Sequence, residues 1–173
     1  MSNLLLFYLS LSNRLFSDRR NPPGGHPLKR QDKGTYILVI EAKENQRISI
    51  GKRPLTNFRK GIYLYVGRAK NGLQGRIKRH LSKKKKRFWH IDYLLQKAKV
   101  QEVWIKRDFF EECQTALEVK SLLKDSSSPL KKFGASDCNC ASHLFYLAER
   151  KTALESLRAK LSFEKVGIHG NPV

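Results

Sequence analysis

The stretch GIYLYVGRAKNGLQGRIKRH, residues 61–80, decides the expected fold. Its first seven residues are rich in aromatic and β-branched side chains, which predicts a strand over 61–67. Tyr63 and Tyr65 lie two positions apart in that strand, so both phenols leave the same face of the sheet. A glycine-rich turn and an arginine-bearing helix follow, an order that is typical of phosphate sites.

The residues after this turn predict a helix, because apolar side chains recur there at helical spacing. These side chains are Leu73, Ile77, Leu81 and Phe88. Arg76 and His80 are four positions apart, so they project from the same side of the helix, one turn from each other. We expect both to face a phosphate group across the surface that carries the tyrosines.

The charge of the chain favours nucleic acid as its partner. The 173 residues include 35 Lys and Arg against 15 Asp and Glu, a net charge of +20, which attracts polyphosphate. Solvated surface lysines and affinity for a membrane surface are the alternatives. The run KKKKR, residues 83–87, is expected to close the helix. It indicates either contact with a nucleic-acid backbone or a solvated loop.

The remaining pattern predicts an α+β fold, with a small central antiparallel sheet of about three strands flanked by helices. Its main strands are expected at 34–42, 61–67 and 99–108, with a short strand at 47–51. Further helices are expected at 87–98, 111–125 and 148–165.

Composition divides the chain into three parts. Residues 1–32 are interpreted as an N-terminal extension that ends in the linker NPPGGHP, because Pro and Gly interrupt any regular element. Residues 33–147 form the expected folded domain, and residues 148–173 a C-terminal helix and tail. The apolar run near the start is shorter than the roughly 20 residues that a membrane span needs, so no membrane association is expected.

Several short motifs together resemble the GIY-YIG nuclease superfamily. They are GTY at 34–36, YVG at 65–67, NGLQGR at 71–76 and RH at 79–80. The tripeptide GIY at 61–63 lies inside the second strand, so the first motif is assigned to GTY, with Thr35 where the family name has isoleucine. WHIDYLL, EC followed by TAL, and FGASDCNCASHLF resemble a small uncharacterised branch of the superfamily, found alone or fused to endonuclease III.

The resemblance implies a metal-dependent phosphodiesterase. In such enzymes the tyrosine of the first motif acts on the attacking water, which here indicates Tyr36, with Tyr65 orienting the nucleophile. Arg76 is expected to stabilise charge on the phosphate, and His80 to assist proton transfer or contact phosphate. A glutamate on a later helix would hold Mg²⁺ or Mn²⁺; this is Glu112 or, alternatively, Glu118.

Two further sets of residues leave alternatives open. His90 either extends the catalytic site or anchors its helix to the sheet together with Trp89. Cys113, Cys138, Cys140 and His143 have the ligand types of a Cys₃His zinc site. The alternative for these is buried, inert cysteines, with His143 capping or serving the active site. A disulfide is not expected.

The function predicted from the sequence is a metal-dependent DNA endonuclease, acting in repair or processing. The rival hypothesis is a non-catalytic nucleic-acid-binding module with the same fold, and a basic surface that recognises phosphate also admits RNA. A cytoplasmic or nucleoid-associated location is expected. The residues predicted to contact nucleic acid are Arg68, Lys70, Arg79, Lys83, Lys84, Lys85, Lys86 and Arg87.

Overall fold

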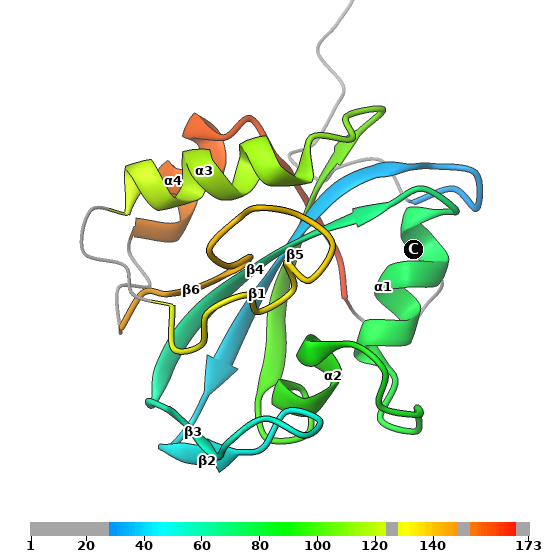
Figure 1. The fold of residues 1–173 in the computed structure, drawn as a ribbon. Coiled ribbons are helices and arrows are strands. Elements are labelled where there is room, and N and C mark those ends of the chain that lie inside the picture. Colours follow the sequence, from blue (N-terminus) through cyan, green and yellow to red (C-terminus); the bar gives the residue numbers. More distant parts are fainter. Residues whose placement is uncertain (1–27, 124–127, 149–152, 169–173) are drawn as a thin grey trace, which may run out of the picture.

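The computed structural model describes residues 28–123, 128–148 and 153–168 (Figure 1). Most of the predicted N-terminal extension, residues 1–27, lies outside this part of the chain. Five strands form an antiparallel sheet in the order β6-β4-β1-β5-β7. They are β1 (Gly34–Ala42), β4 (Gly61–Ala69), β5 (Lys99–Arg107), β6 (Leu144–Tyr146) and β7 (Glu164–Val166).

A separate two-stranded sheet is made by β2 (Gln46–Ile48) and β3 (Thr56–Phe58), which pair antiparallel. Ile48 and Phe58 bury their side chains against the same core as the even-numbered residues of β1. The sequence predicted a strand near β2 but not its partner β3. The hairpin therefore extends the cover over one face of the main sheet.

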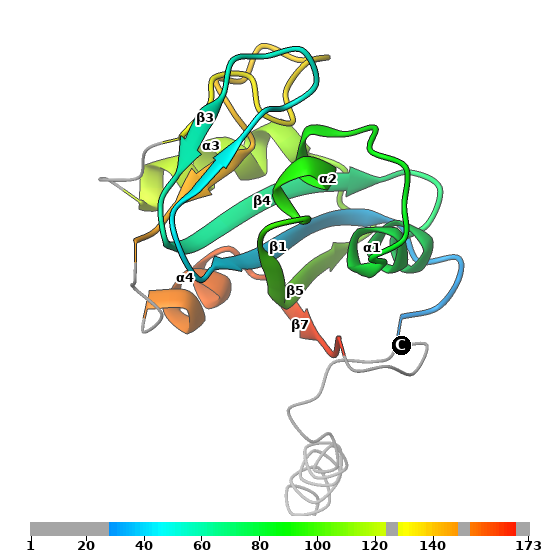
Figure 2. The same cartoon turned by 90° about the horizontal axis from the view of Figure 1, so that it is seen from below.

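Four helices of the described residues cover the sheet from both sides (Figure 2). They are α1 (Leu73–Leu81), α2 (His90–Leu94), α3 (Glu112–Leu122) and α4 (Leu154–Lys160). Apolar side chains of α1 and α2 pack on one face, and those of α3 and α4 pack on the other. This confirms an antiparallel sheet flanked by helices, but with five strands instead of about three.

The central strand β1 shows why the fold has two cores. Tyr36, Leu38 and Ile40 enter the core under α1 and α2, whereas Ile37 and Val39 enter the core under α3 and α4. Successive strand residues point to opposite faces, so a strand buried on both sides becomes almost wholly apolar. The long apolar runs of β1 and β4 therefore encode two different surfaces.

Two local expectations are corrected by the structure, and two short strands are present that the sequence did not predict. The helix α1 ends at Leu81, so residues 83–87 lie in the connection after it and do not close it. Of the helix expected over 148–165, residues 149–152 lie outside the described part of the chain, the described helix is α4, and β7 follows it and pairs with β5. The strands β6 and β7 have three residues each, too few to show an alternating pattern.

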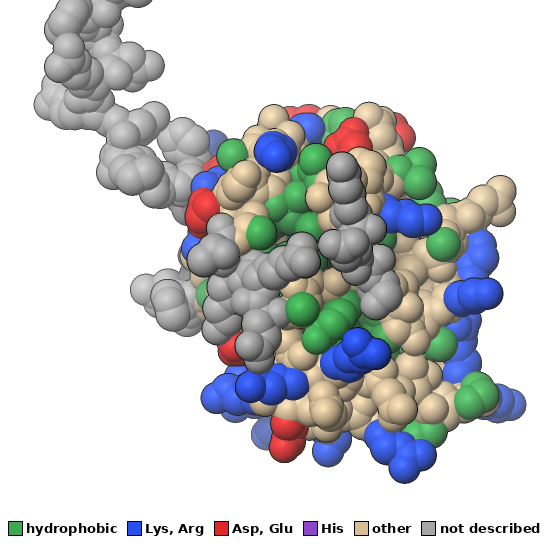
Figure 3. Space-filling model, turned by 90° about the vertical axis from the view of Figure 1, so that its left-hand side faces the viewer, with side chains coloured by type: hydrophobic (Ala, Val, Ile, Leu, Met, Phe, Trp, Pro, Cys, Tyr) green, Lys and Arg blue, Asp and Glu red, His purple; other side chains and the backbone are tan. Residues whose placement is uncertain are grey.

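One side of the molecule carries both basic and hydrophobic side chains (Figure 3). The side of the molecule shown in Figure 3 carries Lys and Arg side chains mainly at its margins, with hydrophobic side chains between them. Within the described residues, no helix has both the length and the apolar character that crossing a membrane requires.

Candidate active site

A cleft of about 610 Å³ opens where β1, β4, α1, the start of α3 and the loop 134–137 meet. The residues predicted for catalysis, metal binding or phosphate contact that line it are Tyr36, Tyr65, Arg68, Lys70, Arg76, His80, His90 and Glu112. These positions are spread from residue 36 to residue 112 but share one cavity. The cleft also includes Asn71, Phe88, Trp89, Ser136 and Asp137, which the motifs had not marked as site residues.

The glycine of the YVG motif has a steric role in this cleft. Gly67 lies opposite Tyr36 in the pairing of β1 with β4. A Cβ atom at Gly67 would lie 2.4 Å from both Cζ and the phenol oxygen of Tyr36, far inside van der Waals contact. The absence of a side chain therefore lets the Tyr36 ring lie across β4 and reach His80.

Tyr36 and His80 form a buried polar pair on the floor of the cleft. The Tyr36 phenol oxygen lies 2.8 Å from Nε2 of His80. Burial, with a further contribution from the Lys85 cation, lowers the pKa of His80 to about 3, so the imidazole is neutral at pH 7. Burial raises the pKa of Tyr36 well above its usual value, although Arg76 opposes this shift. A neutral phenol thus meets a neutral imidazole that can exchange a proton with it.

Tyr65 completes the aromatic floor of the cleft. Its ring centroid lies 6.5 Å from that of Tyr36 and 6.2 Å from that of His80. Burial raises the pKa of the Tyr65 phenol, with the Glu112 carboxylate acting in the same direction. The tyrosines of both motifs are therefore protonated hydrogen-bond donors in the free protein.

The two arginines of α1 have different surroundings. The Arg76 guanidinium lies 4.1 Å from the centre of the Trp89 ring and lines the cleft. Arg79 also contacts Trp89, but its two terminal nitrogens each lie 2.9 Å from an oxygen of buried Asp92. Asp92 in turn accepts hydrogen bonds from the backbone N–H groups of Phe88 and Trp89. Arg79, predicted to contact nucleic acid, is thus paired with a buried carboxylate while 29% of its side chain stays exposed, and Asp92 serves to fix the start of α2.

The cation run 83–87 likewise divides into two groups. The ammonium of Lys85 donates hydrogen bonds to the backbone carbonyls of Arg79 and His80, at the C-terminal end of α1. The other four side chains of the run are exposed: Lys83, Lys84, Lys86 and Arg87. Lys85 is therefore a helix-capping residue, while its neighbours remain open to solvent.

His90 lies in the lining of the cleft and also holds a neighbouring loop. Its Nδ1 accepts a hydrogen bond of 3.1 Å from the backbone N–H of Gly134, which ties the loop 134–137 to the start of α2. The rest of the imidazole lines the cleft. Burial lowers the pKa of His90, so the ring is mainly neutral at pH 7 with its proton on Nε2. That arrangement leaves Nε2–H as a donor.

The structure distinguishes the two candidate glutamates. Glu112 lines the cleft, and its Oε2 lies 3.7 Å from Nε of Arg68. Its other oxygen, Oε1, lies 3.2 Å from Nδ1 of His143. Glu118 accepts a hydrogen bond from the side-chain amide of Gln114 and is absent from the cleft lining. The position of Glu112, and not that of Glu118, is compatible with a cation in the cleft.

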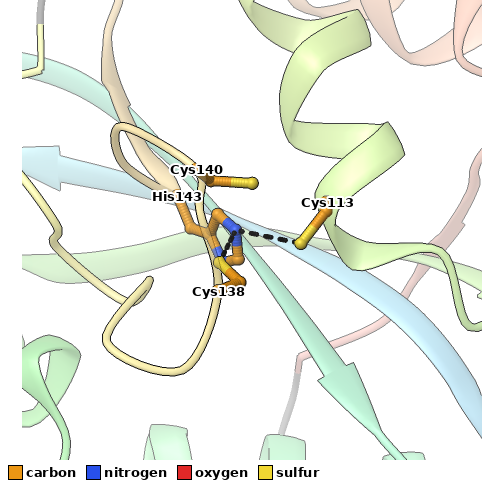
Figure 4. A group of neighbouring side chains, drawn as sticks. All are labelled: Cys113, Cys138, Cys140 and His143. Carbon is orange, nitrogen blue, oxygen red and sulfur yellow. Dashed lines mark hydrogen bonds between the residues drawn. The ribbon is translucent and has the colours of Figure 1, made fainter.

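Next to Glu112, three thiols and an imidazole converge (Figure 4). Their ligand atoms all lie within 4.8 Å of one another, with Nε2 of His143 3.6 Å from Sγ of Cys138 and 4.0 Å from Sγ of Cys113. Four such donors around a tetrahedral zinc ion are separated by roughly 3.5–3.8 Å. All three cysteines are free thiols. The cluster of Cys113, Cys138, Cys140 and His143, here called the Cys₃His cluster, could therefore bind a metal such as zinc.

Comparison with known proteins supplies one match. A family model described as "Domain of unknown function DUF123" matches residues 35–165. No curated protein and no solved structure matches the chain. The matched range includes every residue that lines the cleft and all members of the Cys₃His cluster.

Proposed function

Since the match covers more than half of its length, the chain belongs to the DUF123 family, and on that premise we propose that it is a metal-dependent endonuclease that hydrolyses DNA phosphodiester bonds. The observation that carries the proposal is the Tyr36–His80 pair of 2.8 Å at the floor of a cleft with arginines and a glutamate in its walls. The motif order GTY, YVG and arginine helix supports placing the family in the GIY-YIG superfamily. Fusion of relatives to endonuclease III stays a prediction.

In the proposed reaction, water attacks the phosphorus atom, the new P–O bond forms and the bond to the leaving sugar oxygen breaks. The leaving oxygen departs with the electron pair of that bond and takes a proton from solvent water. Tyr36 takes a proton from the attacking water as it passes its own proton to Nε2 of His80. A bound phosphate adds negative charge beside a histidine whose pKa is lowered mainly by burial and further by Lys85 and Arg76. Substrate binding therefore raises the basicity of His80 when the proton must be accepted.

Cations in the cleft walls would stabilise the charge that develops on the phosphate. Arg76 is held against the Trp89 ring, which limits the movement of its guanidinium. Arg68 and Lys70 lie in the same lining. Donors that are already in position give the largest electrostatic contribution, because little reorganisation is required at the transition state.

Two kinds of metal fit the side chains present. Glu112 would hold Mg²⁺ or Mn²⁺, since a carboxylate is a hard oxygen ligand, and the ion would neutralise the leaving oxygen. We assign the Cys₃His cluster to structural Zn²⁺, because thiolate and imidazole ligands suit that ion.

The rival function is a binding module that keeps the basic surface without catalysis, and Thr35 in the first motif is one feature that favoured it. Thr35 is fully buried, and its hydroxyl donates a hydrogen bond of 2.7 Å to the backbone carbonyl of Phe109. It does not line the cleft. Threonine in place of isoleucine therefore affects the contact between β1 and Phe109, outside the cleft, and gives no reason to expect an inactive site.

The test is cleavage of supercoiled plasmid and branched oligonucleotides in Mg²⁺ or Mn²⁺. We expect Tyr36→Phe to lower the rate by about 10²–10⁴-fold and Arg76→Ala by roughly 10²–10³-fold. Glu112→Gln should abolish the metal-dependent rate, and Glu118→Gln is its matched control, with the rate unchanged. Binding is followed on the same samples by gel shift.

Absence of cleavage by the wild type, with binding that Tyr36→Phe leaves intact, would establish the binding module instead. Parallel assays with RNA of the same structure show whether DNA or RNA is the substrate. A cytoplasmic or nucleoid-associated location follows from a DNA substrate and is checked by imaging the tagged full chain.

A further inference from the structure

The first turn of α3 belongs to the cleft and to the Cys₃His cluster at once. Glu112 and Cys113 are consecutive residues, and successive helical side chains point about 100° apart. Glu112 accordingly lines the cleft, while Cys113 turns to the thiols (Figure 4). This turn has no side-chain cap among the described residues, so the helix supplies no local device of that kind to hold its own start.

His143 connects the two sites through the two sides of its ring. Its Nε2 faces the sulfur atoms of Cys138 and Cys113, and its Nδ1 lies 3.2 Å from Oε1 of Glu112. In the structure this contact is close but does not have hydrogen-bond geometry, since buried Nδ1 has no hydrogen-bond partner. A metal ligated by Nε2 would leave the ring proton on Nδ1, where a small shift of either side chain would let it donate to the carboxylate. A histidine ligand that donates its second nitrogen to a carboxylate is a recurring arrangement in metal sites, and it fixes both partners.

The loop that supplies the other cluster ligands also forms part of the cleft wall. Gly134, at the start of this loop, has a positive φ of 69° and packs so closely that a Cβ there would lie 2.7 Å from the Tyr65 ring. Its backbone N–H donates a hydrogen bond to Nδ1 of His90. Four residues after Gly134, Cys138 contributes its sulfur to the cluster. Closing the cluster around a metal would therefore join α3 to this loop across the cleft.

We propose that metal bound in the Cys₃His cluster positions Glu112, so that occupancy of the cluster controls the affinity of the cleft for a divalent cation. This inference rests on the proposed function in one respect, namely that Glu112 is a ligand of the cleft cation. The Oε1 atom of Glu112 faces Nδ1 of His143, whereas Oε2, which now lies 3.7 Å from Nε of Arg68, is the oxygen that would be offered to that cation. The cluster is thus a positioning site for the cleft in addition to a link between α3 and the loop.

Linkage makes the coupling measurable without nucleic acid. If zinc raises the affinity of the cleft for Mn²⁺, Mn²⁺ must raise the affinity of the cluster for zinc by the same factor. Under reducing conditions, a zinc-selective chromophoric chelator would compete with the full chain for Zn²⁺, with and without saturating Mn²⁺. We expect Mn²⁺ to tighten zinc binding by about 10-fold, the lower end of the effect of a carboxylate partner on a histidine-ligated metal.

Variants separate this coupling from ordinary stabilisation. Glu112→Gln retains a side chain that can accept from His143 but loses the charge that binds Mn²⁺, so the tightening should fall below about twofold while zinc still binds. Glu118→Gln should keep the full effect, and Cys113→Ser should weaken zinc binding itself. Circular dichroism confirms that each variant is folded.

Three results would overturn the inference: zinc affinity in the wild type that Mn²⁺ changes by less than about twofold, full coupling in Glu112→Gln, or zinc binding that survives Cys113→Ser unchanged. Paramagnetic relaxation of water protons measures Mn²⁺ binding directly, and no binding with zinc present also rejects the inference. Coupling without DNA cleavage would reject only the proposed nuclease activity, and cleavage without coupling only the positioning role.

Discussion

The two faces of the main sheet are built from the same strands but have different compositions. Under α3 and α4, the buried residues of β1 and β4 are aliphatic, as in Ile37, Val39 and Leu64. Under α1 and α2, the same strands contribute Tyr36 and Tyr65, and α1 adds buried His80. One face is suited to burying apolar area, and the other gives up some of that area to hold polar atoms beside a cleft.

The contrast suggests that the apolar face mainly stabilises the fold, whereas the polar face holds the side chains of the cleft. A buried phenol or imidazole is costly unless it has a partner, and the Tyr36–His80 pair supplies one. The opposite core has no comparable polar pair among its clustered residues. Substitutions on the two faces should therefore affect different measurements.

The largest expected change in stability comes from the aliphatic face. Ile37→Ala should lower the free energy of unfolding by about 2–5 kcal/mol, since the fully buried side chain leaves a cavity. Urea denaturation measures this loss, and nucleic-acid binding by the folded protein should be unchanged. Leu117→Ala, at an exposed position on α3, is the control; it should lower the free energy of unfolding by less than about 0.5 kcal/mol. Loss of nucleic-acid binding in folded Ile37→Ala would contradict the expectation that this face affects stability alone.

A smaller loss of stability, with a larger effect on function, is expected at the glycine beneath Tyr36. Gly67→Ala should cost about 1–3 kcal/mol, because the added methyl group overlaps the phenol. The ring must move away from His80, so proposed cleavage should fall at least as far as in Tyr36→Phe. The double variant Gly67→Ala/Tyr36→Phe should show little additional loss of rate. Additive losses would contradict a single shared mechanism.

The pH dependence of stability tests the polar core. The pKa of His80 is about 3 in the folded protein, against roughly 6.5 when unfolded. The unfolded state therefore binds more protons below pH 6.5, so stability is lost as pH falls from about 6.5 towards 3. The contribution is up to about 1.4 kcal/mol for each pH unit. In His80→Gln this part of the slope should disappear in urea denaturation between pH 6 and pH 4. A slope equal to that of the wild type would show that His80 is not buried neutral.

The smallest effects are expected in the cation run, where two lysines should respond differently. Lys84→Gln should weaken nucleic-acid binding slightly and reduce the slope of log affinity against log salt by about one unit, provided that Lys84 contacts a phosphate. Lys85→Gln should instead lower thermal stability, since its ammonium caps the end of α1. Fluorescence anisotropy at several salt concentrations and thermal melts distinguish the two. Equal effects of both variants would show that the run acts as one uniform patch.

Prediction from the sequence succeeded where a signal was long or had a simple period. The strands β1 and β4 have nine residues each, and the two-residue spacing of Tyr63 and Tyr65 correctly placed both phenols on one face. The Cys/His spacing indicated a cluster that the structure does bring together. The strands β6 and β7 are too short for such a signal, and they form because β4 and β5 offer free edges for pairing.

The division of the basic residues followed no sequence pattern. Arg79 resembles Arg76, and Lys85 resembles Lys84, in everything that local sequence shows. Asp92 holds Arg79, and the end of α1 holds Lys85, through contacts made only after the chain folds. The choice between Glu112 and Glu118 was equally dependent on the position of α3 against the sheet.

The alternation that makes two cores, the basic character of the chain and the types of side chain available for a site can all be read along the chain. They follow from local geometry and composition, which need no distant partner. The contact of Tyr36 with His80, the position of Glu112 between the cleft and His143, and the pairing of Arg79 with Asp92 arise only when the chain folds. Each of these contacts joins residues distant in sequence, so its energy depends on how strands and helices pack, not on the residues beside it.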